Sequence, residues 1–303
     1  MKTAFLFAGQ GSQFVGMGRD FYEEYQRFRE VFDLLPEKQK QIAFEGPEDE
    51  LRNTANTQPI LLAFALGVYG VINDTGLKCD VAAGLSLGEY SALAASGVFS
   101  PRQALELIQF RADAMAKASE GTNTVMSAVL GLDRDKVIKA AVAGGCEIAN
   151  YNCPGQIVIS GTECDVKAAE AEAGALGAKR CVRLAVSGPF HTSYMKPAGE
   201  ALKQRFERES FAEEAFPVVF NCKGSVRNGE RISELLVKQV SGSVMFEDTI
   251  RYMSSVGVTR AVEIGPGRAL SQFVKKTCGD IETVSIERTA DLGRISTWTE
   301  ERQ

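Results

Sequence analysis

The segment Gly84-Leu85-Ser86-Leu87-Gly88 places a serine between two glycines in a GxSxG pattern. An apolar run, Asp80–Gly84, precedes the serine, and a helix-forming run from Gly88 to about Ala95 follows it. In this context a GxSxG segment forms a strained strand-to-helix turn that lifts the serine oxygen into a cleft. The pattern therefore predicts that Ser86 is a nucleophile, although so short a motif also fits a serine with a structural role in a turn.

A serine hydroxyl needs a base to take its proton at neutral pH, and His191 is the only histidine of the chain. The preceding segment Ser187-Gly188-Pro189-Phe190 predicts an irregular turn after a strand, a common place for a catalytic residue. A lone histidine is also often a packed or surface residue. Since no Asp or Glu stands out as a third member, a backbone carbonyl is a second way to orient the ring.

The glycine-rich segment Gly9-Gln10-Gly11-Ser12-Gln13 follows the first predicted strand, Ala4–Phe7. Ligands of open α/β sheets collect at the carboxyl ends of the strands. Backbone N–H groups of this segment, together with that of Leu87, are candidates for an oxyanion hole. The alternative is a phosphate-binding loop, but neither the G-x-G-x-x-G nor the Walker spacing is present.

Arg111 lies on an apolar face of a predicted helix that runs from Pro101 to about Ala118. Its neighbours three and four residues away cannot pair with a guanidinium, so burial there needs an anionic partner from elsewhere. A remote carboxylate of the chain is one such partner. A substrate carboxylate, held by the planar fork of the guanidinium, is the other.

Short apolar runs alternate with amphipathic stretches, which predicts an α/β fold. Helices are expected at Asp20–Asp33 and Ile60–Ile72. Between residues 123 and 190 the pattern changes to β-α-β-β-α-β, which is typical of a ferredoxin-like unit. Its expected last strand is Arg180–Val186. We therefore expect a discontinuous large α/β domain, residues 1–122 and 191–303, with a small subdomain at 123–190.

The composition excludes several classes of protein. The net charge is −5 over 303 residues and the isoelectric point is about 5.3, which disfavours nucleic-acid binding. The apolar run Ile60–Ile72 is shorter than the roughly 18 residues of a membrane span. Scattered cysteines without a CxxC pair predict reduced thiols in a cytoplasmic protein, with neither a disulfide framework nor a metal site. The seven cysteines are Cys79, Cys146, Cys153, Cys164, Cys181, Cys222 and Cys278.

Taken together, these residues resemble the malonyl-CoA:acyl-carrier-protein transacylase family over nearly the whole chain. The order and separation of the motifs carry the resemblance, since each motif alone is weak. The matching segments are Phe7-Ala8-Gly9-Gln10-Gly11-Ser12-Gln13, Thr57-Gln58-Pro59, Gly84-Leu85-Ser86-Leu87-Gly88-Glu89-Tyr90, Arg111, Asn150-Tyr151-Asn152, Pro154-Gly155-Gln156, His191, Met195-Lys196-Pro197 and Glu263-Ile264-Gly265-Pro266-Gly267.

The resemblance implies an α/β-hydrolase-like large domain with an inserted ferredoxin-like subdomain, and a ping-pong mechanism. Ser86 would take the malonyl group from malonyl-CoA, with His191 as general base and Arg111 on the free carboxylate. The backbone amides of Gln10 and Leu87 would hold the oxyanion. A main-chain carbonyl, assigned by alignment to Met245, would orient the histidine.

The acyl group would pass to the phosphopantetheine thiol of an acyl carrier protein, in fatty-acid or polyketide synthesis. No permanently bound cofactor, nucleic acid or membrane is expected, and the family is largely monomeric. Lys179, Arg180 and Arg183 form the densest basic cluster, which is a candidate docking patch for an acidic carrier but equally fits a solvated surface.

The resemblance further implies pocket positions at Gln58, Leu85, Asn152 and Phe190. Leu85 stands where the family commonly has histidine, which alters the pocket but removes no base. Phe190 is a bulky residue that would disfavour an α-methyl group by about 1–3 kcal/mol. Two other functions remain to be separated from transfer: hydrolysis of acyl groups, which has no use for Arg111 when the acyl chains are neutral, and a non-catalytic scaffold, which has no use for Ser86 or His191.

Overall fold

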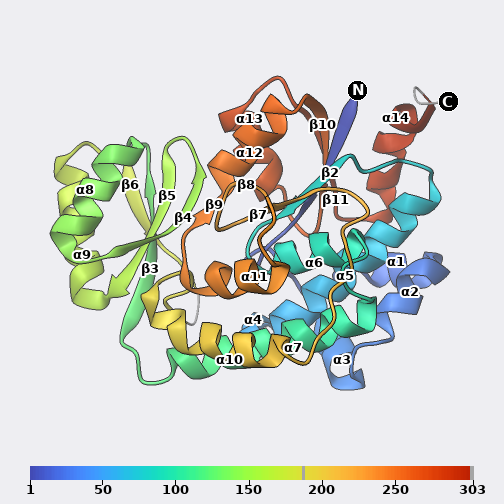
Figure 1. The fold of residues 1–303 in the computed structure, drawn as a ribbon, viewed down its shortest axis with the longest axis horizontal. Helices are drawn as coiled ribbons and strands as arrows, with labels where there is room; N and C mark the ends of the chain where they lie inside the picture. Colours follow the sequence, from blue (N-terminus) through green and yellow to red (C-terminus); the bar gives the residue numbers. More distant parts are fainter. Residues whose placement is uncertain (186–187, 301–303) are drawn as a thin grey trace. The chain divides into compact units, whose positions relative to one another are not determined.

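The computed structural model describes residues 1–185 and 188–300 of the chain, drawn in Figure 1. The chain divides into two compact units. Unit 1 comprises residues 1–112, 211–219 and 253–303, and unit 2 comprises residues 113–210 and 220–252.

The core of unit 1 is a parallel sheet built around β1 (Lys2–Phe7). Hydrogen bonds join β1 to β10 (Val258–Ile264) on one side and to β2 (Val81–Gly84) on the other. Beyond them lie β11 (Glu282–Ile286) and β7 (Val218–Phe220), so that the order of these five strands is β11-β10-β1-β2-β7. The central strands are buried along almost their whole length, as expected for a parallel sheet with both faces covered. Because the strands are parallel, the segments after Phe7, Gly84 and Ile264 emerge at one edge of the sheet.

Helix α5 (Thr54–Asp74) is the longest helix of unit 1, with 21 residues. The side chain of Asn53 caps it by accepting a hydrogen bond from the amide of Ala55. Within the part of the chain that the structure describes, α5 has the length and hydrophobicity of a membrane span, but 78% of its apolar window is buried inside the protein. Helix α5 is therefore a buried helix in the core of unit 1. The other helices of unit 1 are α1 (Arg19–Glu24), α2 (Gln26–Phe32), α3 (Glu37–Glu45), α4 (Glu48–Arg52), α6 (Leu87–Ala95), the first turns of α7 (Pro101–Ser119), α13 (Ala269–Thr277), the 3-10 helix η2 (Thr289–Ile295) and α14 (Ser296–Glu300).

Unit 2 contains a second sheet, with strand order β6-β3-β5-β4-β9. Its four longer strands pair with one another in antiparallel fashion, whereas β9 pairs with β4 in parallel: β3 (Thr124–Leu130), β4 (Glu147–Cys153), β5 (Gln156–Thr162) and β6 (Arg180–Arg183). Helices α8 (Arg134–Gly144) and α9 (Glu163–Ala175) pack on this sheet through a cluster of buried apolar side chains that includes Val137, Ile159 and Val166. The predicted β-α-β-β-α-β order is thus confirmed, although β6 ends at Arg183 and Val186 lies outside the described residues.

Unit 2 extends beyond the predicted subdomain boundaries of 123 and 190. The short strand β9 (Val244–Met245) pairs with β4, which ties residues far along the chain to this sheet. The remaining elements of the unit are η1 (Ser193–Met195), α10 (Lys196–Phe206), β8 (Ser225–Val226), α11 (Ile232–Ser241) and most of α12 (Phe246–Ser255).

Candidate active site

Ser86 occupies the turn between β2 and α6 in a strained backbone conformation, with φ 56° and ψ −107°. An L-residue rarely adopts a positive φ, which costs about 1–3 kcal/mol and is found mostly at functional sites. The serine is half-buried, and Leu87 directly after it is the first residue of α6. The strand–turn–helix context predicted for a nucleophile is therefore confirmed.

The glycines around Ser86 are required by close backbone contacts. A Cβ atom on Gly84 would lie 1.9 Å from the carbonyl carbon of Gly88, and one on Gly88 would lie 2.1 Å from the carbonyl oxygen of Phe7. Similarly, a Cβ atom on Gly9 would lie 2.7 Å from the carbonyl oxygen of Leu85. The turn that carries the serine is thus packed directly against the glycine-rich loop that follows β1.

Arg111 is completely buried on α7, and two of its hydrogen bonds end on neutral oxygen atoms. Its Nη1 atom donates to Oε1 of Gln58 at 2.8 Å, and its Nη2 atom donates to Oγ of Ser86 at 3.1 Å. The guanidinium carbon also lies 5.5 Å from the centre of the Tyr90 ring, on α6. Burial lowers the pKa of Arg111 by disfavouring its charged form, and the nearby Tyr90 and Glu89 partly oppose this shift. The geometry therefore places a desolvated guanidinium at Ser86, the predicted nucleophile.

Helix α5 contributes two polar side chains that contact the residues around Ser86. Gln58, which accepts from Arg111, lies one turn after Thr54, whose Oγ1 atom accepts from Nε2 of Gln10 at 3.4 Å. One face of α5 therefore contacts both the glycine-rich loop and the guanidinium. The amide of Leu87 begins α6 and has no acceptor within that helix, as expected of a group available to bind an oxyanion.

His191 lies in unit 2 and shares an unusual backbone property with Ser86. Its φ is 62°, and among residues 1–185 and 188–300 these two are the only non-glycine residues with a positive φ. Local hydrogen bonds hold the strained segment: Oγ1 of Thr192 donates to the carbonyl of Pro189 at 2.6 Å, and Glu147 accepts from both the amide and the hydroxyl of Ser193. The strain is thus maintained by the surrounding structure, as expected at a functional site.

The imidazole of His191 is oriented by the backbone of Gln239. Its Nδ1 atom lies 2.9 Å from the carbonyl oxygen of Gln239, in the last turn of α11. A carbonyl oxygen only accepts, so Nδ1 carries the proton and Nε2 keeps the lone pair that a general base needs. The prediction that Met245 supplies this carbonyl is wrong, because the carbonyl that lies at Nδ1 is that of Gln239. Carbonyls of a final helical turn lack intrahelical donors, which explains why Gln239 is available.

The remaining predicted pocket residues fall in both units. Leu85 adjoins Ser86 in unit 1, whereas Phe190 and Asn152 are buried in unit 2, the first next to His191 and the second on β4. The structure thus brings Ser86, Arg111 and Gln58 together within unit 1, and His191 with its orienting carbonyl within unit 2.

Comparison with known proteins identifies the family of this chain. The model of the acyl transferase domain matches residues 4–295. Malonyl CoA-acyl carrier protein transacylase of Bacillus subtilis is 40% identical over 295 residues, which cover 94% of this chain and 93% of the relative. This chain belongs to the malonyl-CoA:acyl-carrier-protein transacylase family.

Solved structures agree with the assignment to the transacylase family. The malonyl CoA-acyl carrier protein transacylase of Clostridium perfringens is similar with a TM-score of 0.95 and 35% identity, covering 100% of this chain and 98% of that one. A malonyl-transacylase solved in complex with its type II polyketide acyl-carrier protein is similar with a TM-score of 0.93 and 34% identity, covering 98% of this chain and 99% of that one.

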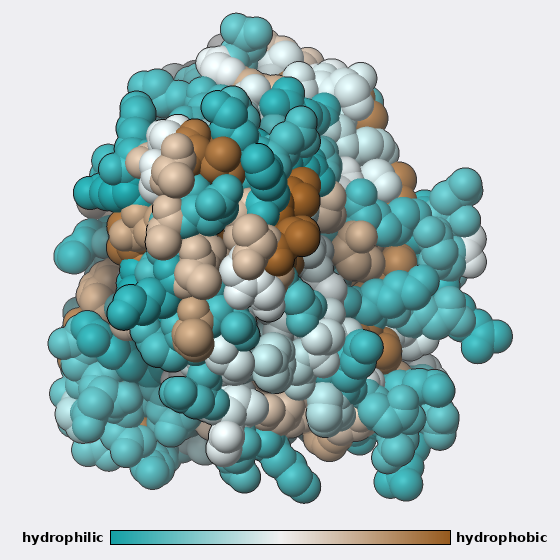
Figure 2. All heavy atoms as spheres, turned by 90° about the vertical axis from the view of Figure 1, so that its left-hand side faces the viewer, coloured by the Kyte–Doolittle hydropathy of each residue, from teal (hydrophilic) through white to brown (hydrophobic). Residues whose placement is uncertain are grey.

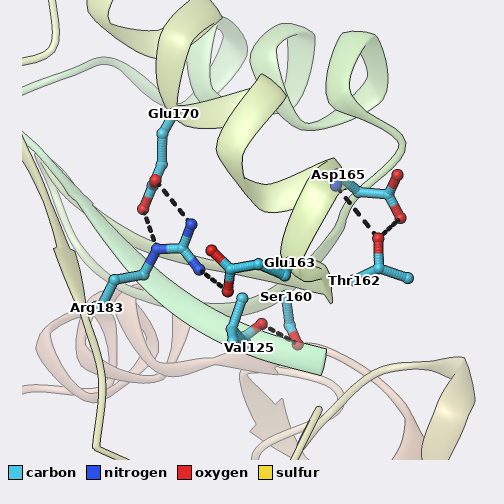
Figure 3. A network of polar contacts seen from close by, with 7 residues as sticks. All are labelled: Val125, Ser160, Thr162, Glu163, Asp165, Glu170 and Arg183. Carbon is cyan, nitrogen blue, oxygen red and sulfur yellow. Dashed lines mark hydrogen bonds and ion pairs between the residues drawn. The ribbon is translucent and has the colours of Figure 1, made fainter. Parts of the chain in front are cut away.

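The basic cluster predicted as a docking patch of this transacylase is less cationic than its sequence suggests. Arg183 makes a two-pronged ion pair with Glu170, with distances of 2.7 and 3.0 Å, and a further hydrogen bond of 3.1 Å to Glu163 (Figure 3). Among the described residues, Lys179 and Arg180 are exposed and form no ion pair with an acidic side chain, in contrast to Arg183. Figure 2, viewed from the side of α8 and α9, shows mainly hydrophilic side chains with small hydrophobic groups among them. Scattered apolar groups of this kind are normal on a protein surface and identify no docking site.

Proposed function

We propose that this chain transfers a malonyl group from malonyl-CoA to the phosphopantetheine thiol of an acyl carrier protein through an acyl-enzyme on Ser86. The observation that carries the proposal is the contact of Arg111 with Ser86. In a malonyl ester, only the ester carbonyl carbon and one methylene separate the serine oxygen from the carboxylate carbon. A guanidinium 3.1 Å from Oγ is therefore within reach of the carboxylate of a malonyl group bound to that atom.

In the first half-reaction, Oγ of Ser86 attacks the thioester carbonyl while Nε2 of His191 takes the hydroxyl proton. The tetrahedral oxyanion is held by the backbone amides of Gln10 and Leu87. When the C–S bond breaks, His191 donates this proton to the leaving sulfur, and coenzyme A departs as the thiol. The products are the malonyl ester of Ser86 and free coenzyme A.

In the second half-reaction, the carrier thiol attacks the ester carbonyl and His191 takes the thiol proton. The C–O bond then breaks, and the proton passes to Oγ of Ser86. Malonyl-CoA is thus a substrate, and phosphopantetheine arrives on the partner, so that no permanently bound cofactor is required. Gln58 holds the guanidinium, and Leu85, Asn152 and Phe190 shape the acyl pocket, with Phe190 disfavouring methylmalonyl groups.

We also propose a fold type for each unit and a cellular setting for the enzyme. Unit 1 corresponds to an α/β-hydrolase-like domain, and the strand order β6-β3-β5-β4 supports a ferredoxin-like subdomain. We further propose a cytoplasmic monomer whose acidic carrier docks near Lys179 and Arg180, with Arg183 contributing little charge because of its two acidic partners.

Transfer and hydrolysis are separated by one experiment. Purified protein is incubated with malonyl-CoA, with and without a phosphopantetheine-bearing acyl carrier protein, and malonyl-carrier and free malonate are quantified. Transfer predicts that malonyl-carrier forms much faster than malonate. Release of malonate at the same rate with and without the carrier would instead establish a hydrolase.

A further inference from the structure

A second glycine turn, Gly265-Pro266-Gly267, packs against the proposed oxyanion loop, Gly9-Gln10-Gly11-Ser12-Gln13. It follows β10, the neighbour of β1, and the amide of Ala8 donates to the carbonyl of Ile264 at 3.0 Å. A Cβ atom on Gly265 would lie 2.4 Å from Cβ of Ala8. A Cβ atom on Gly267 would lie 2.9 Å from Oγ of Ser12, inside the loop itself. Any displacement of this turn would therefore be transmitted directly to the oxyanion loop.

The carboxylate of Glu287 is hydrogen-bonded to the backbone of this turn. Its Oε2 atom accepts from the amide of Gly267 at 2.7 Å. Glu287 directly follows β11 and is itself fixed, since its amide donates to Oδ2 of Asp291 at 3.1 Å. A second carboxylate, that of Glu263, accepts from the amides of Leu270 and Ser271 and so anchors the start of α13 just beyond the turn. The turn is thus held by carboxylate–amide bonds, which are stronger than those between neutral groups.

We propose that Glu287 is a positioning residue for the oxyanion hole, acting through Gly267 and Ser12 on the amide of Gln10. The inference rests on the proposed function, in which that amide binds the transition state. Gly267 has φ 83°, and because glycine adopts positive and negative φ about equally, its residue type alone does not favour this conformation. The hydrogen bond from its amide to Glu287 selects that conformation and seats the turn against Ser12.

The proposed role predicts a specific kinetic effect. The oxyanion exists only in the transition state, so a displaced donor lowers the rate of acylation and leaves the binding of malonyl-CoA nearly unchanged. Complete loss of an oxyanion donor costs about 100-fold or more, and a displaced donor costs less. We therefore expect Glu287→Ala to lower the acylation rate about tenfold at unchanged KM. Glu287→Gln keeps an acceptor oxygen and should retain most of the rate.

The control is Glu282→Ala, which removes an exposed carboxylate from the other end of the same strand. The experiment measures single-turnover malonylation of Ser86 in these variants of the full chain, together with their unfolding temperatures. Slow malonylation in Glu287→Ala, with near-normal rates in Glu287→Gln and Glu282→Ala, would support the proposal. Wild-type rates in Glu287→Ala, or equal losses in Glu287→Ala and Glu287→Gln, would overturn it.

A second pair of variants tests the same path if Glu287→Ala does not fold. Gly267→Ala and Gly257→Ala both place a methyl group at a positive φ, but only the first has atoms within 4 Å of that methyl, those of Ser12. Gly267→Ala alone should slow acylation, and equal rates in the two variants would contradict the proposed path.

A fluorophosphonate probe separates this inference from the proposed function. Oγ of Ser86 forms the P–O bond, the P–F bond breaks, fluoride departs, and His191 takes the proton. A wild-type protein that reacts with the probe but not with malonyl-CoA would refute the malonyl transfer, whereas equal probe rates in wild type and Glu287→Ala would refute the role of Glu287.

Discussion

The Nη2 atom of Arg111 lies 3.1 Å from the Oγ atom of Ser86. Burying a guanidinium without water is costly, and burial lowers the pKa of this one. Buried charges of this kind are found mostly at functional sites, and the carboxylate of a substrate would form an ion pair with this guanidinium. In the proposed function, this contact therefore links Ser86 to the choice of acyl group.

Substitution of Arg111 tests this link. Arg111→Ala should lower kcat/KM for malonyl-CoA at least about a hundredfold, or about 3 kcal/mol, because the substrate carboxylate would be buried without its partner. Acetyl-CoA has no carboxylate, so kcat/KM for acetyl-CoA should change little. Steady-state kinetics with both thioesters provide the measurement, and equal losses for the two would refute a carboxylate-binding role.

Substitution of Gln58 alters the surroundings of the Arg111 guanidinium without removing it. Gln58→Glu would place a carboxylate where the amide oxygen now lies, 2.8 Å from Nη1 of Arg111. Because this internal anion competes with the substrate carboxylate, kcat/KM for malonyl-CoA should fall about tenfold or more. Gln58→Met, of similar size and uncharged, is the control, and a loss as large in that variant would show that packing rather than charge is responsible.

Gly88 tests the packing of the nucleophile turn. A Cβ atom at this position would lie 2.1 Å from the carbonyl oxygen of Phe7, so Gly88→Ala must displace either α6 or β1. We expect a loss of about 1–3 kcal/mol in the free energy of unfolding, and loss of Ser86 acylation. Gly174→Ala, in helix α9 with open space around the new methyl, is the matched control and should be neutral or slightly stabilising. Similar denaturation midpoints for the two variants would contradict the predicted clash.

The cysteines give a pH-dependent prediction. Burial raises the pKa of the Cys146 thiol to about 11, and the neighbouring Asp165 adds to the shift. Since the thiolate is the reactive form, only about one molecule in a thousand is reactive at pH 8, and alkylation should accelerate as the pH rises toward 11. Exposed Cys164 should react first with iodoacetamide at pH 8. Peptide mapping after brief labelling checks the order, and rapid modification of Cys146 at pH 8 would contradict it.

Local signals in the sequence predict the parts of the site that depend on side chains. Ser86 follows from a strand, a glycine pattern and a helix start, and Arg111 from a cation on an apolar helical face. Gln239 could not be predicted in this way, because it contributes only a backbone carbonyl at a helix end, and any residue type supplies one.

The limits of the fold prediction have a similar origin. The expected helix Asp20–Asp33 is divided into α1 and α2 because Tyr25 adopts an extended conformation, with φ −119° and ψ 118°, despite an uninterrupted helical pattern. The extent of unit 2 depends on β9, a two-residue strand whose pairing with β4 is a tertiary event without a local signal.

The central claim is that Ser86 carries the acyl group and needs His191 to acquire it. The most direct measurement is mass spectrometry of the protein after brief incubation with malonyl-CoA, with the modified residue located by peptide mapping. We expect one malonyl group on the Ser86 peptide of the wild-type protein, none in Ser86→Ala, and greatly slowed labelling in His191→Ala. Labelling of another residue, or unchanged labelling in either variant, would contradict it.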